Sequence, residues 1–398
     1  MLNGKKIVLG VSGGIAIYKA VDLVSKLRKR GAEVRVVMTE HATKFVSPLL
    51  FSEISGNPAA VTMWDNRGEH SVEHIALAKW ADLLVVAPAT ANILAKAACG
   101  LADDLLSTVL LATPCPKIVC PAMNSGMYTN PATQANLETL RRRGYTVMEP
   151  DAGHLACGVN GPGRLPEVPE IIAFLERFTA LREGRLRGLR FLVTAAGTRE
   201  PIDPVRYVGN RSSGKMGYAV AREALLQGAD VTLVTGPSAL TPPPYAKVVR
   251  VETTQQMLDA CLAAYPDVDV VIKAAAVADF KPRDVADQKI KKIDPEDGMT
   301  VVMDQNPDIL KILGSHKQQQ FLVGFAAETQ HLLENAAAKV RKKNLDMIVA
   351  NDVTRPGAGF DVDTNIVTLI TGEGQEALPM MTKAEVADQI LDHVMKLK

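Results

Sequence analysis

A single cysteine stands in the most unusual stretch of the sequence, DAGHLACGVNGPGRLPE at residues 151–167. Because glycine and proline interrupt both helices and strands, we predict that this stretch forms neither and is a mobile loop. A thiol can transfer a proton, and a mobile loop can bring it to a bound substrate. Cys157 is therefore a candidate functional residue; the alternative is an exposed thiol without a chemical role.

The stretch GVSGGIAIYK, residues 10–19, follows a predicted strand and opens a predicted helix. Its glycines let the backbone come close to a ligand, and the helix N-terminus offers free N–H groups to a phosphate. The spacing is not GxGxxG, and no acidic residue closes the next strand, so a mononucleotide phosphate fits better than a dinucleotide. The alternative is a tight strand–helix turn without a ligand.

Two further strand ends carry candidate residues. APATANILAKAACG, residues 87–100, supplies small side chains and hydroxyls, a surface against which a flat ring can lie. CPAMNSGMY, residues 120–128, places Asn124 beyond the following strand, where its amide could donate to a carboxylate. His74 lies on a predicted helix of apolar residues, and a histidine in such a place is more often structural than catalytic.

In the second half of the chain, GNRSSGKMG at residues 209–217 has the glycine and lysine spacing of a phosphate-binding P-loop. Met216 stands where that motif needs a Mg²⁺-binding hydroxyl, so we reject the P-loop. The segment still ends at a predicted helix start, where backbone N–H groups could hold an anion.

Charged residues follow the next predicted strand ends. Asp279 lies in AAAVADFKP (274–282), and KIKK (289–292) brings compact cations suited to a triphosphate. In a strand, Lys289 and Lys291 would share one side; the alternative for this segment is a solvated basic edge.

NPDIL, residues 306–310, predicts a helix with Asn306 as the N-cap and Pro307 at the first helical position. The N-terminus of this helix could meet a phosphate or a base edge. The segments 324–329 and 339–352 add three residues to the same strand-end face: Phe325, Lys339 and Lys343.

The elements that position these residues are short apolar runs alternating with helix-period segments. Such runs are typical of parallel strands covered by helices on both faces, and the alternation predicts a doubly wound α/β fold. The pattern restarts after a charged linker near residue 185, so we predict two Rossmann-like domains, 1–185 and 186–398. Ligands bind beyond the carboxyl ends of strands in such sheets, so each domain should carry a site there. The predicted strands are 6–11, 33–39, 82–89, 117–122, 191–197, 229–237, 268–280, 321–329 and 346–352.

Composition excludes several classes of protein. The 398 residues are 47% hydrophobic and carry a formal net charge of +1, which argues against a dedicated nucleic-acid binder. Five scattered cysteines without CxxC spacing suggest neither disulfides nor a zinc site. No apolar segment approaches the roughly 20 residues that span a bilayer, and no signal peptide is evident. We therefore expect a cytoplasmic protein without membrane or nucleic-acid partners.

Taken together, GVSGGIAIYK, His74, APATANILAK, PAMN (121–124) and HLACGVNGPGRL (154–165) resemble the homo-oligomeric flavin-containing cysteine decarboxylases over residues 1–180. The resemblance implies a flavodoxin-like domain in which FMN binds between the subunits of a trimer. It also implies that His74 and Asn124 belong to the active site and that the cysteine loop closes over the substrate. The cofactor positions that it implies are Gly10, Ser12, Gly13, Gly14, Thr39, Pro88, Ala89 and Thr90.

The chemistry of such a decarboxylase gives the cysteine a role. Loss of CO2 from a cysteinyl carboxylate leaves a carbanion, which becomes stable once FMN has oxidised the CH2–S unit to a thioaldehyde. The resulting enethiolate must then gain a proton and a hydride. We expect Cys157 to donate that proton, Asn124 to bind the carboxylate and His74 to act as a base or an orienting group.

The second half is similar to the phosphopantothenate–cysteine ligases of bacteria over about residues 190–352, through TAAGTREPIDPVRYVGNRSSGKMG, AAAVADF, KIKK, NPDIL and GFAAET. With both halves in this order, the chain resembles the bifunctional coenzyme A biosynthesis flavoproteins of bacteria. The resemblance implies that CTP, with Mg²⁺, activates 4′-phosphopantothenate as an acyl-cytidylate, from which the amine of L-cysteine displaces CMP. It gives Lys289 the activation step and Asn210 the intermediate, without identifying metal ligands. The CTP positions that it implies are Ala274, Ala275, Asp279, Lys289, Pro307, Asp308, Ile309, Leu310, Phe325, Lys339 and Lys343.

Family ligases dimerise, so a homo-oligomer with trimeric and dimeric contacts could close into a dodecamer. Two other classes are less consistent with the sequence. Flavin-binding regulatory proteins that resemble the first half lack a ligase half and often carry acidic tails, unlike QILDHVMKLK at this C-terminus. A nicotinamide-dependent dehydrogenase would need the dinucleotide fingerprint and the acidic ribose partner, which are absent.

Overall fold

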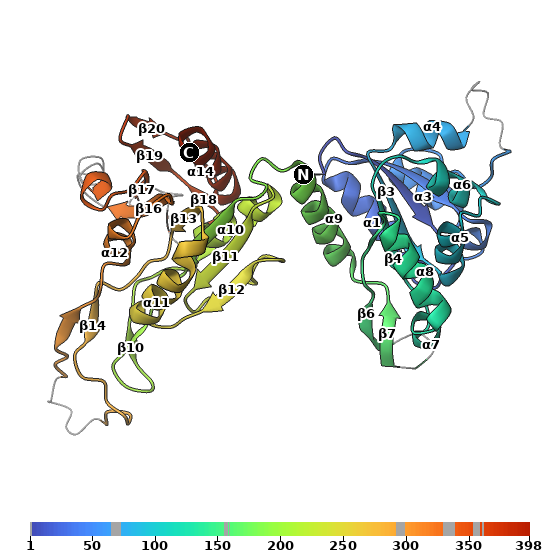
Figure 1. Cartoon of the computed structure of the whole chain (residues 1–398). Coiled ribbons are helices and arrows are strands. Elements are labelled where there is room, and N and C mark those ends of the chain that lie inside the picture. The colour runs from blue at the N-terminus through green and yellow to red at the C-terminus, as the bar shows by residue number, and fades with distance from the viewer. Residues whose placement is uncertain are drawn as a thin grey trace. The chain divides into compact units, whose positions relative to one another are not determined.

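The computed structural model describes residues 2–64, 73–154, 158, 160–291, 299–328, 339–352, 359 and 362–398. The chain divides into two compact units, residues 1–178 and 179–398, each of which is described by itself (Figure 1). Among the described residues, no helix is long and apolar enough to cross a membrane.

The first unit is built on a parallel sheet whose described strands have the order β2-β1-β3-β4-β5. This is the flavodoxin-like order, and it confirms the predicted fold of this part of the chain. The chain reverses its direction of winding between β1 and β3, which creates a crevice at their carboxyl ends. The strands are β1 (Lys6–Val11), β2 (Glu33–Met38), β3 (Leu83–Ala89), β4 (Lys117–Pro121) and β5 (Thr146–Val147).

Helices cover both faces of this sheet (Figure 1). Alternate residues of β1 enter two separate cores: Leu9 packs with one set of helices and Val8 with the other. The first set is α1 (Ile17–Lys29), α3 (Pro48–Ser55) and α9 (Val168–Glu183). The second set is α4 (Glu73–Trp80), α5 (Ala91–Cys99), α6 (Leu105–Ala112) and α8 (Pro131–Arg142). Two short helices, α2 (Glu40–Thr43) and α7 (Ser125–Tyr128), follow β2 and β4.

The glycine-rich stretch contains a hairpin, so the prediction that it forms no strand is wrong. β6 (Asp151–His154) and β7 (Asn160–Arg164) pair antiparallel, with an irregularity between Asp151 and Ala152. The hairpin packs closely on the loop after β4, where the amide of Met123 donates to the carbonyl of Gly163 (2.9 Å). Gly163 has a φ of +126°, and a Cβ there would lie 2.3 Å from the Met123 carbonyl oxygen. Glycine therefore permits this packing instead of preventing strand formation.

The second unit has a larger sheet with the order β12-β11-β8-β13-β16-β17-β19-β20. All neighbours from β12 to β17 are parallel, whereas β19 and β20 pair antiparallel. The winding reverses between β8 and β13, which confirms the predicted doubly wound architecture. The strands are β8 (Arg190–Ala195), β11 (Asp230–Thr235), β12 (Lys247–Arg250), β13 (Val270–Lys273), β16 (Phe321–Glu328), β17 (Met347–Asp352), β19 (Val367–Thr371) and β20 (Gln375–Ala377).

Two layers of helices cover this second sheet. One face carries α10 (Lys215–Leu226) and α14 (Lys383–Leu397), and the other carries α11 (Thr254–Ala264) and α12 (Ile309–Ser315). The 3-10 turn η1 (Tyr265–Asp267) follows α11, and residues 339–342 are helical. Short antiparallel pairs project from the loops: β9 (Glu200–Pro201) with β10 (Tyr207–Val208), β14 (Phe280–Pro282) with β15 (Met303–Gln305), and β18 (Thr364–Asn365) with β21 (Met381–Thr382).

Candidate functional sites

A cavity of about 440 Å³ opens at the carboxyl ends of β1, β3 and β4 in the first unit. It brings together four residues that were predicted from separate motifs: Gly13, Gly14, Thr90 and Asn124. The other lining residues come from α1, from the loop after β4 and from the β6–β7 hairpin: Ile15, Ala16, Tyr18, Lys19, Ala91, Ala122, Met123, Met127, His154, Gly163, Arg164 and Leu165.

Ser12 joins the two strand ends beneath this cavity. Its hydroxyl donates to the carbonyl of Pro88 (2.7 Å) and accepts from the amide of Thr90 (3.0 Å). Helix α1 has no side-chain N-cap bond; the amide of its first residue, Ile17, donates to the carbonyl of Gly14 in the glycine turn (3.0 Å). Ser12, Pro88, Ala89 and Thr90 thus lie at the edge of the sheet where the helix dipole favours an anion.

Two of the predicted cofactor positions have structural reasons of their own. Thr39 is the N-cap of α2 and accepts from the amide of Ala42 (3.2 Å). Gly10 lies within β1, where a Cβ would come within 2.5 Å of the Leu106 side chain. The small size of Gly10 therefore serves the packing of α6 against the sheet.

Asn124 is the N-cap of α7, and its side-chain oxygen accepts from the amide of Gly126 (2.8 Å). The hairpin adds His154 and Arg164 to the same cavity, two polar side chains to which the sequence analysis gave no role. His74 lies half-buried on α4 and is not among the described residues that line this cavity. Cys157 lies outside the described residues.

In the second unit, a cavity of about 130 Å³ lies between the start of α10 and the ends of β13, β16 and β17. Ala274, Ala275 and Phe325, which come from two separate motifs, line it. The helix start predicted at GNRSSGKMG is confirmed: α10 begins at Lys215, with Gly214 in the left-handed conformation (φ +84°). The other lining residues were not named individually as site positions from the sequence: Ser212, Ser213, Gly214, Met216, Gly217, Ala276, Ala326, Asn351, Gly359, Asn365 and Lys383.

Asn210 is held close to these strand ends. Its side-chain amide donates to the carbonyl of Val277 (2.8 Å), and the amide of the neighbouring Ala276 donates to the carbonyl of Ala196 (2.8 Å). A Cβ on Gly197 would come within 2.9 Å of the Asn210 carbonyl oxygen. The loops after β8 and β13 are therefore packed against each other at the crevice, with Asn210 between them.

The helix predicted at NPDIL begins later than expected, so the assignment of Asn306 as N-cap is wrong. α12 begins at Ile309, and Asp308 is its N-cap, accepting from the amide of Lys311 (3.0 Å). Asn306 is only 7% exposed, and its amide donates to the hydroxyl of Thr254 (3.2 Å) and to the carbonyl of Ala278 (3.0 Å). A buried polar network therefore takes the side chain that would have capped the helix.

Asp308 also forms an ion pair with Lys343, 2.8 Å from Oδ2 to Nζ, which joins two predicted nucleotide positions. Burial alone would raise the pKa of the Asp308 carboxyl, but hydrogen bonds from Lys343 and from the Lys311 amide hold it below its usual value. The backbone carbonyl of Asp279, a third predicted position, accepts from the amide of Asn306 (2.8 Å). Pro307, Ile309, Leu310 and Lys339 flank this group.

Lys289 is exposed, and residues 289–291 do not form the strand considered for them. The next residue, Ile290, is anchored: its amide donates to Asp203 (3.2 Å), and its carbonyl accepts from Arg206 (2.9 Å). The Asp203 side chain is fully buried, and its hydrogen bonds from Arg206 hold the pKa of its carboxyl far below the usual value. This ion pair therefore fixes the backbone beside Lys289.

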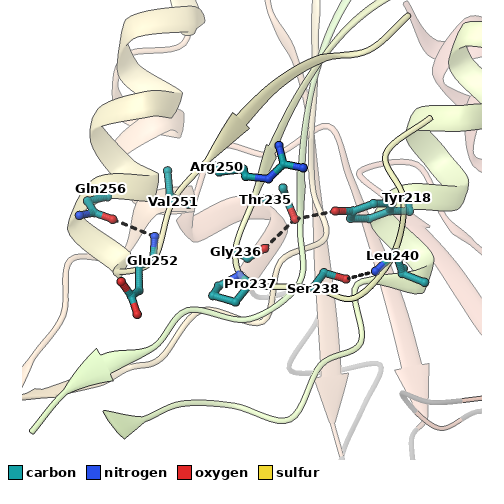
Figure 2. Close-up of a pocket in the computed structure, with 10 residues that line it drawn as sticks. All are labelled: Tyr218, Thr235, Gly236, Pro237, Ser238, Leu240, Arg250, Val251, Glu252 and Gln256. Carbon is teal, nitrogen blue, oxygen red and sulfur yellow. Dashed lines mark hydrogen bonds between the residues drawn. The ribbon is translucent and has the colours of Figure 1, made fainter. Parts of the chain in front are cut away.

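A third cavity, of about 540 Å³, lies at the carboxyl ends of β11 and β12 (Figure 2). The hydroxyl groups of Thr235 and Tyr218 share a hydrogen bond (3.3 Å). The hydroxyl of Ser238 donates to the carbonyl of Ser213 (2.9 Å). The second bond ties the wall of this cavity to the loop that opens α10. None of the residues predicted from the motifs lines it.

Comparison with known proteins agrees with this two-site organisation. The family described as "Flavoprotein" matches residues 1–180, and the family described as "DNA/pantothenate metabolism flavoprotein C-terminal domain" matches residues 186–397. The coenzyme A biosynthesis bifunctional protein CoaBC of Vibrio vulnificus is 47% identical over 397 residues, covering 100% of this chain and 98% of the relative. This chain belongs to the family of bifunctional coenzyme A biosynthesis proteins.

Other members of the bifunctional family are similarly close. The CoaBC proteins of Bacillus subtilis and Escherichia coli K12 are 47% and 46% identical, covering 100% and 99% of this chain and 98% and 97% of their own lengths. Among solved structures, a C-terminal domain of CoaBC is 47% identical and covers 52% of this chain and 94% of its own, with a TM-score of 0.45. A mutant PPC decarboxylase complexed with pantothenoylaminoethenethiol is 33% identical and covers 44% and 98%, with a TM-score of 0.41.

Proposed function

We propose that the second unit joins 4′-phosphopantothenate to L-cysteine at the expense of CTP, and that the first unit decarboxylates the product to 4′-phosphopantetheine. The observation that carries the proposal is that full-length similarity to bifunctional coenzyme A biosynthesis proteins coincides with a cavity at the switch point of each sheet. A decarboxylase and a ligase acting in succession need two such sites.

The residues around the first cavity fit FMN. The N-terminus of α1, which has no side-chain cap, lies beside the strand ends joined by Ser12 and offers its dipole to a phosphate. The small residues Gly14, Thr90 and Ala91 leave room for a flat ring. When bound, FMN supplies reversible two-electron chemistry: it accepts two electrons from the CH2–S unit and returns them in the last step.

The first unit's own residues then have three tasks. Asn124, presented by the turn before α7, binds the carboxylate that leaves as CO2, and its position is fixed by its bond from Gly126. Cys157 donates a proton to the enethiolate carbon after CO2 has left. His74 acts as a base or orients the thiol; because it lies outside the described lining of its own chain's cavity, we assign it to the cavity of a neighbouring subunit.

In the second unit, CTP occupies the cavity between α10 and the ends of β13 and β16. The N-terminus of α10 provides the fixed dipole, and Lys343 the positive charge, that a triphosphate needs. Lys289 stabilises charge as the carboxylate attacks the α-phosphate, and Asn210 holds the acyl-cytidylate until the amine of cysteine displaces CMP. We expect Mg²⁺ to bind together with CTP, because this ion is commonly coordinated by substrate phosphates and by few protein ligands.

Exposed apolar residues support assembly of each unit with copies of itself. Ile15, Tyr18, Leu49 and Leu50 are exposed on α1, α3 and the turn before α1, where we place a trimer contact. Tyr207, Phe280, Val285, Ile290 and Val302 are exposed on and beside the short strand pairs of the second unit, where we place a dimer contact. Together these contacts could close into a dodecamer. The unpaired cysteines Cys99, Cys115, Cys120 and Cys261 are consistent with a reducing cytoplasm.

The test is Cys157→Ser in the full chain, with both half-reactions followed separately and Cys99→Ser, another unpaired thiol, as the control. We expect flavin content and CMP release to stay unchanged while 4′-phosphopantetheine formation stops at an oxidised product that has already lost CO2. If 4′-phosphopantetheine forms at the wild-type rate, Cys157 is not the proton donor. If CTP is not consumed in the presence of phosphopantothenate and cysteine, the ligase assignment is wrong.

A further inference from the structure

Lys273 is the last residue of β13, in the middle of the large sheet of the second unit. Its strand neighbours are Thr194 on β8 and Gly324 on β16. Alternation along the strand places its side chain on the same face as Val271 and Ala275, which pack with α11 and α12. The side chain is thus directed toward the start of α12, beside the nucleotide positions proposed above.

The ammonium group of Lys273 is poorly satisfied by the protein. Within the described part of the chain, its recorded hydrogen bond is a long one, 3.4 Å to the carbonyl oxygen of Ala275. The ionisable groups whose charges influence it are Lys343, Asp308, Asp279 and the thiol of Cys261 on α11. The Asp308 carboxylate is already paired with Lys343 and accepts from the Lys311 amide, so it is shared between two cations.

The surroundings of Lys273 disfavour the charged form of its side chain. Burial, followed by repulsion from Lys343, lowers the pKa of its ammonium to about 8, and the attraction of Asp308, Cys261 and Asp279 does not offset this. A lowered pKa means that the charged form is favoured more in the unfolded chain than in the folded chain. A destabilising charge beside a ligand site is typical of residues that are kept for function.

We propose that Lys273 is a further binding residue of the nucleotide site and that its ammonium neutralises phosphate oxygens of the triphosphate. The position fits, because Lys273 immediately precedes Ala274 and Ala275, which line the cavity, and its ammonium group lies 3.4 Å from the Ala275 carbonyl oxygen. Two ammonium groups that repel each other in the free protein become favourable once several negative charges lie between them. The inference rests on the proposed CTP site.

A structural role would have the opposite signature. If Lys273 only held the Ala275 carbonyl in place, its removal would destabilise the protein. If it binds phosphate, Lys273→Met makes the free protein more stable and weakens nucleotide binding. The two readouts must therefore move in opposite directions.

The experiment compares wild type, Lys273→Met, Lys273→Arg and the exposed-surface control Lys247→Met as full chains. The melting temperature is measured at pH 7 and pH 9.5, and the Kd of CTP with Mg²⁺ is measured by calorimetry over the same range. We expect Lys273→Met to melt higher at pH 7, with a smaller gain at pH 9.5, where the wild-type lysine is largely neutral when folded. Its Kd for CTP should rise about tenfold or more, and Lys247→Met should match wild type.

Lys273→Arg separates charge from shape. Because arginine stays charged, this variant should keep most of the CTP affinity at pH 9.5, where the wild-type affinity falls as Lys273 loses its proton. A lower melting temperature for Lys273→Met together with an unchanged Kd would overturn the inference. If wild type itself does not bind CTP, the proposed nucleotide site fails; if wild type and Lys273→Met bind equally, only the role of Lys273 fails.

Discussion

The ammonium group of Lys19 lies 2.7 Å from the carbonyl oxygen of Leu165, and this contact joins helix α1 to the end of the β6–β7 hairpin. Lys19 is only 6% exposed and also forms a 3.0 Å ion pair with Glu167. Bonds from Lys19 and Arg164 hold the pKa of the Glu167 carboxyl below its usual value. One buried cation thus connects the helix that faces the flavin cavity with the hairpin whose sequence contains Cys157.

Replacing Lys19 by methionine should loosen the hairpin while leaving the glycine turn intact. We expect the first unit to lose about 1–3 kcal/mol of unfolding free energy, because the buried Leu165 carbonyl loses its donor. Bound flavin should still be reduced by the substrate, whereas its reoxidation, which needs Cys157, should slow about tenfold. Stopped-flow absorbance of the flavin measures both rates. Lys26→Met is the control, since Lys26 lies on the same helix in an exposed pair with Asp22. Equal slowing of reduction and reoxidation would contradict a role in placing the hairpin.

Gly236 has no room for a side chain. A Cβ there would lie 2.0 Å from the carbonyl oxygen of Gly197, in the loop that packs against Asn210. We expect Gly236→Ala to destabilise the second unit by about 1–3 kcal/mol and to lower CMP release more than decarboxylation. Gly374→Ala is the control, because no atom lies within 4 Å of a Cβ at that position. Urea unfolding and separate assays test this, and a ligase rate equal to that of Gly374→Ala would show that the loop tolerates the shift.

Asp203 stabilises the second unit in a pH-dependent way. Its carboxyl has a lowered pKa when folded, so its contribution is present above the unfolded pKa of about 4 and is lost as pH falls toward the folded value. We expect Asp203→Asn to unfold at lower denaturant than wild type at pH 7, with a gap that narrows below about pH 4. Because Ile290 loses a charged acceptor beside Lys289, the rate of CMP formation should fall about tenfold while CTP binding changes less. An unchanged rate would mean that Lys289 is positioned by other contacts.

The hydroxyl of Thr254 lies at the centre of a buried network. It donates to Glu200 (2.6 Å) and accepts from Asn306 (3.2 Å), and all three residues are less than a tenth exposed. Thr254→Val keeps the shape but leaves buried polar groups without this partner, so we expect a loss of about 1–3 kcal/mol. Thr254→Ser should retain most of the stability. Thermal unfolding of the two variants tests this prediction. Equal losses of stability in Thr254→Val and Thr254→Ser would contradict a role of the hydroxyl.

The central parallel strands followed from the apolar runs, because a buried parallel strand such as β1 or β3 leaves a continuous run of apolar residues in the sequence. The β6–β7 hairpin could not be predicted from the sequence. Its glycines are required by close packing on Met123, which lies far away in the sequence. The start of α12 was misplaced for a similar reason, since Thr254 engages Asn306.

In the candidate sites too, some residues could be predicted from the sequence and others could not. Residues inside a motif, such as Asn124 and Ala275, could be assigned from the sequence because the motif itself places them at a strand end. Lys273 could not be assigned in this way, because its unfavourable charge depends on burial and on Lys343, which only the fold brings about. Sequence patterns therefore predict which loops form a site, while the electrostatics of the site require the tertiary structure.

The last turns of α9 matter for anyone who wishes to express the two activities separately. Ala180 and Leu186 are fully buried, the amide of Leu186 donates to the carbonyl of Gln227 (2.9 Å), and Arg185 bonds Asp388 (2.6 Å). A ligase fragment cut at residue 186 would expose the surface that Ala180 and Arg185 cover. A fragment that starts at residue 179 keeps these N-terminal contacts and should be more stable and more soluble.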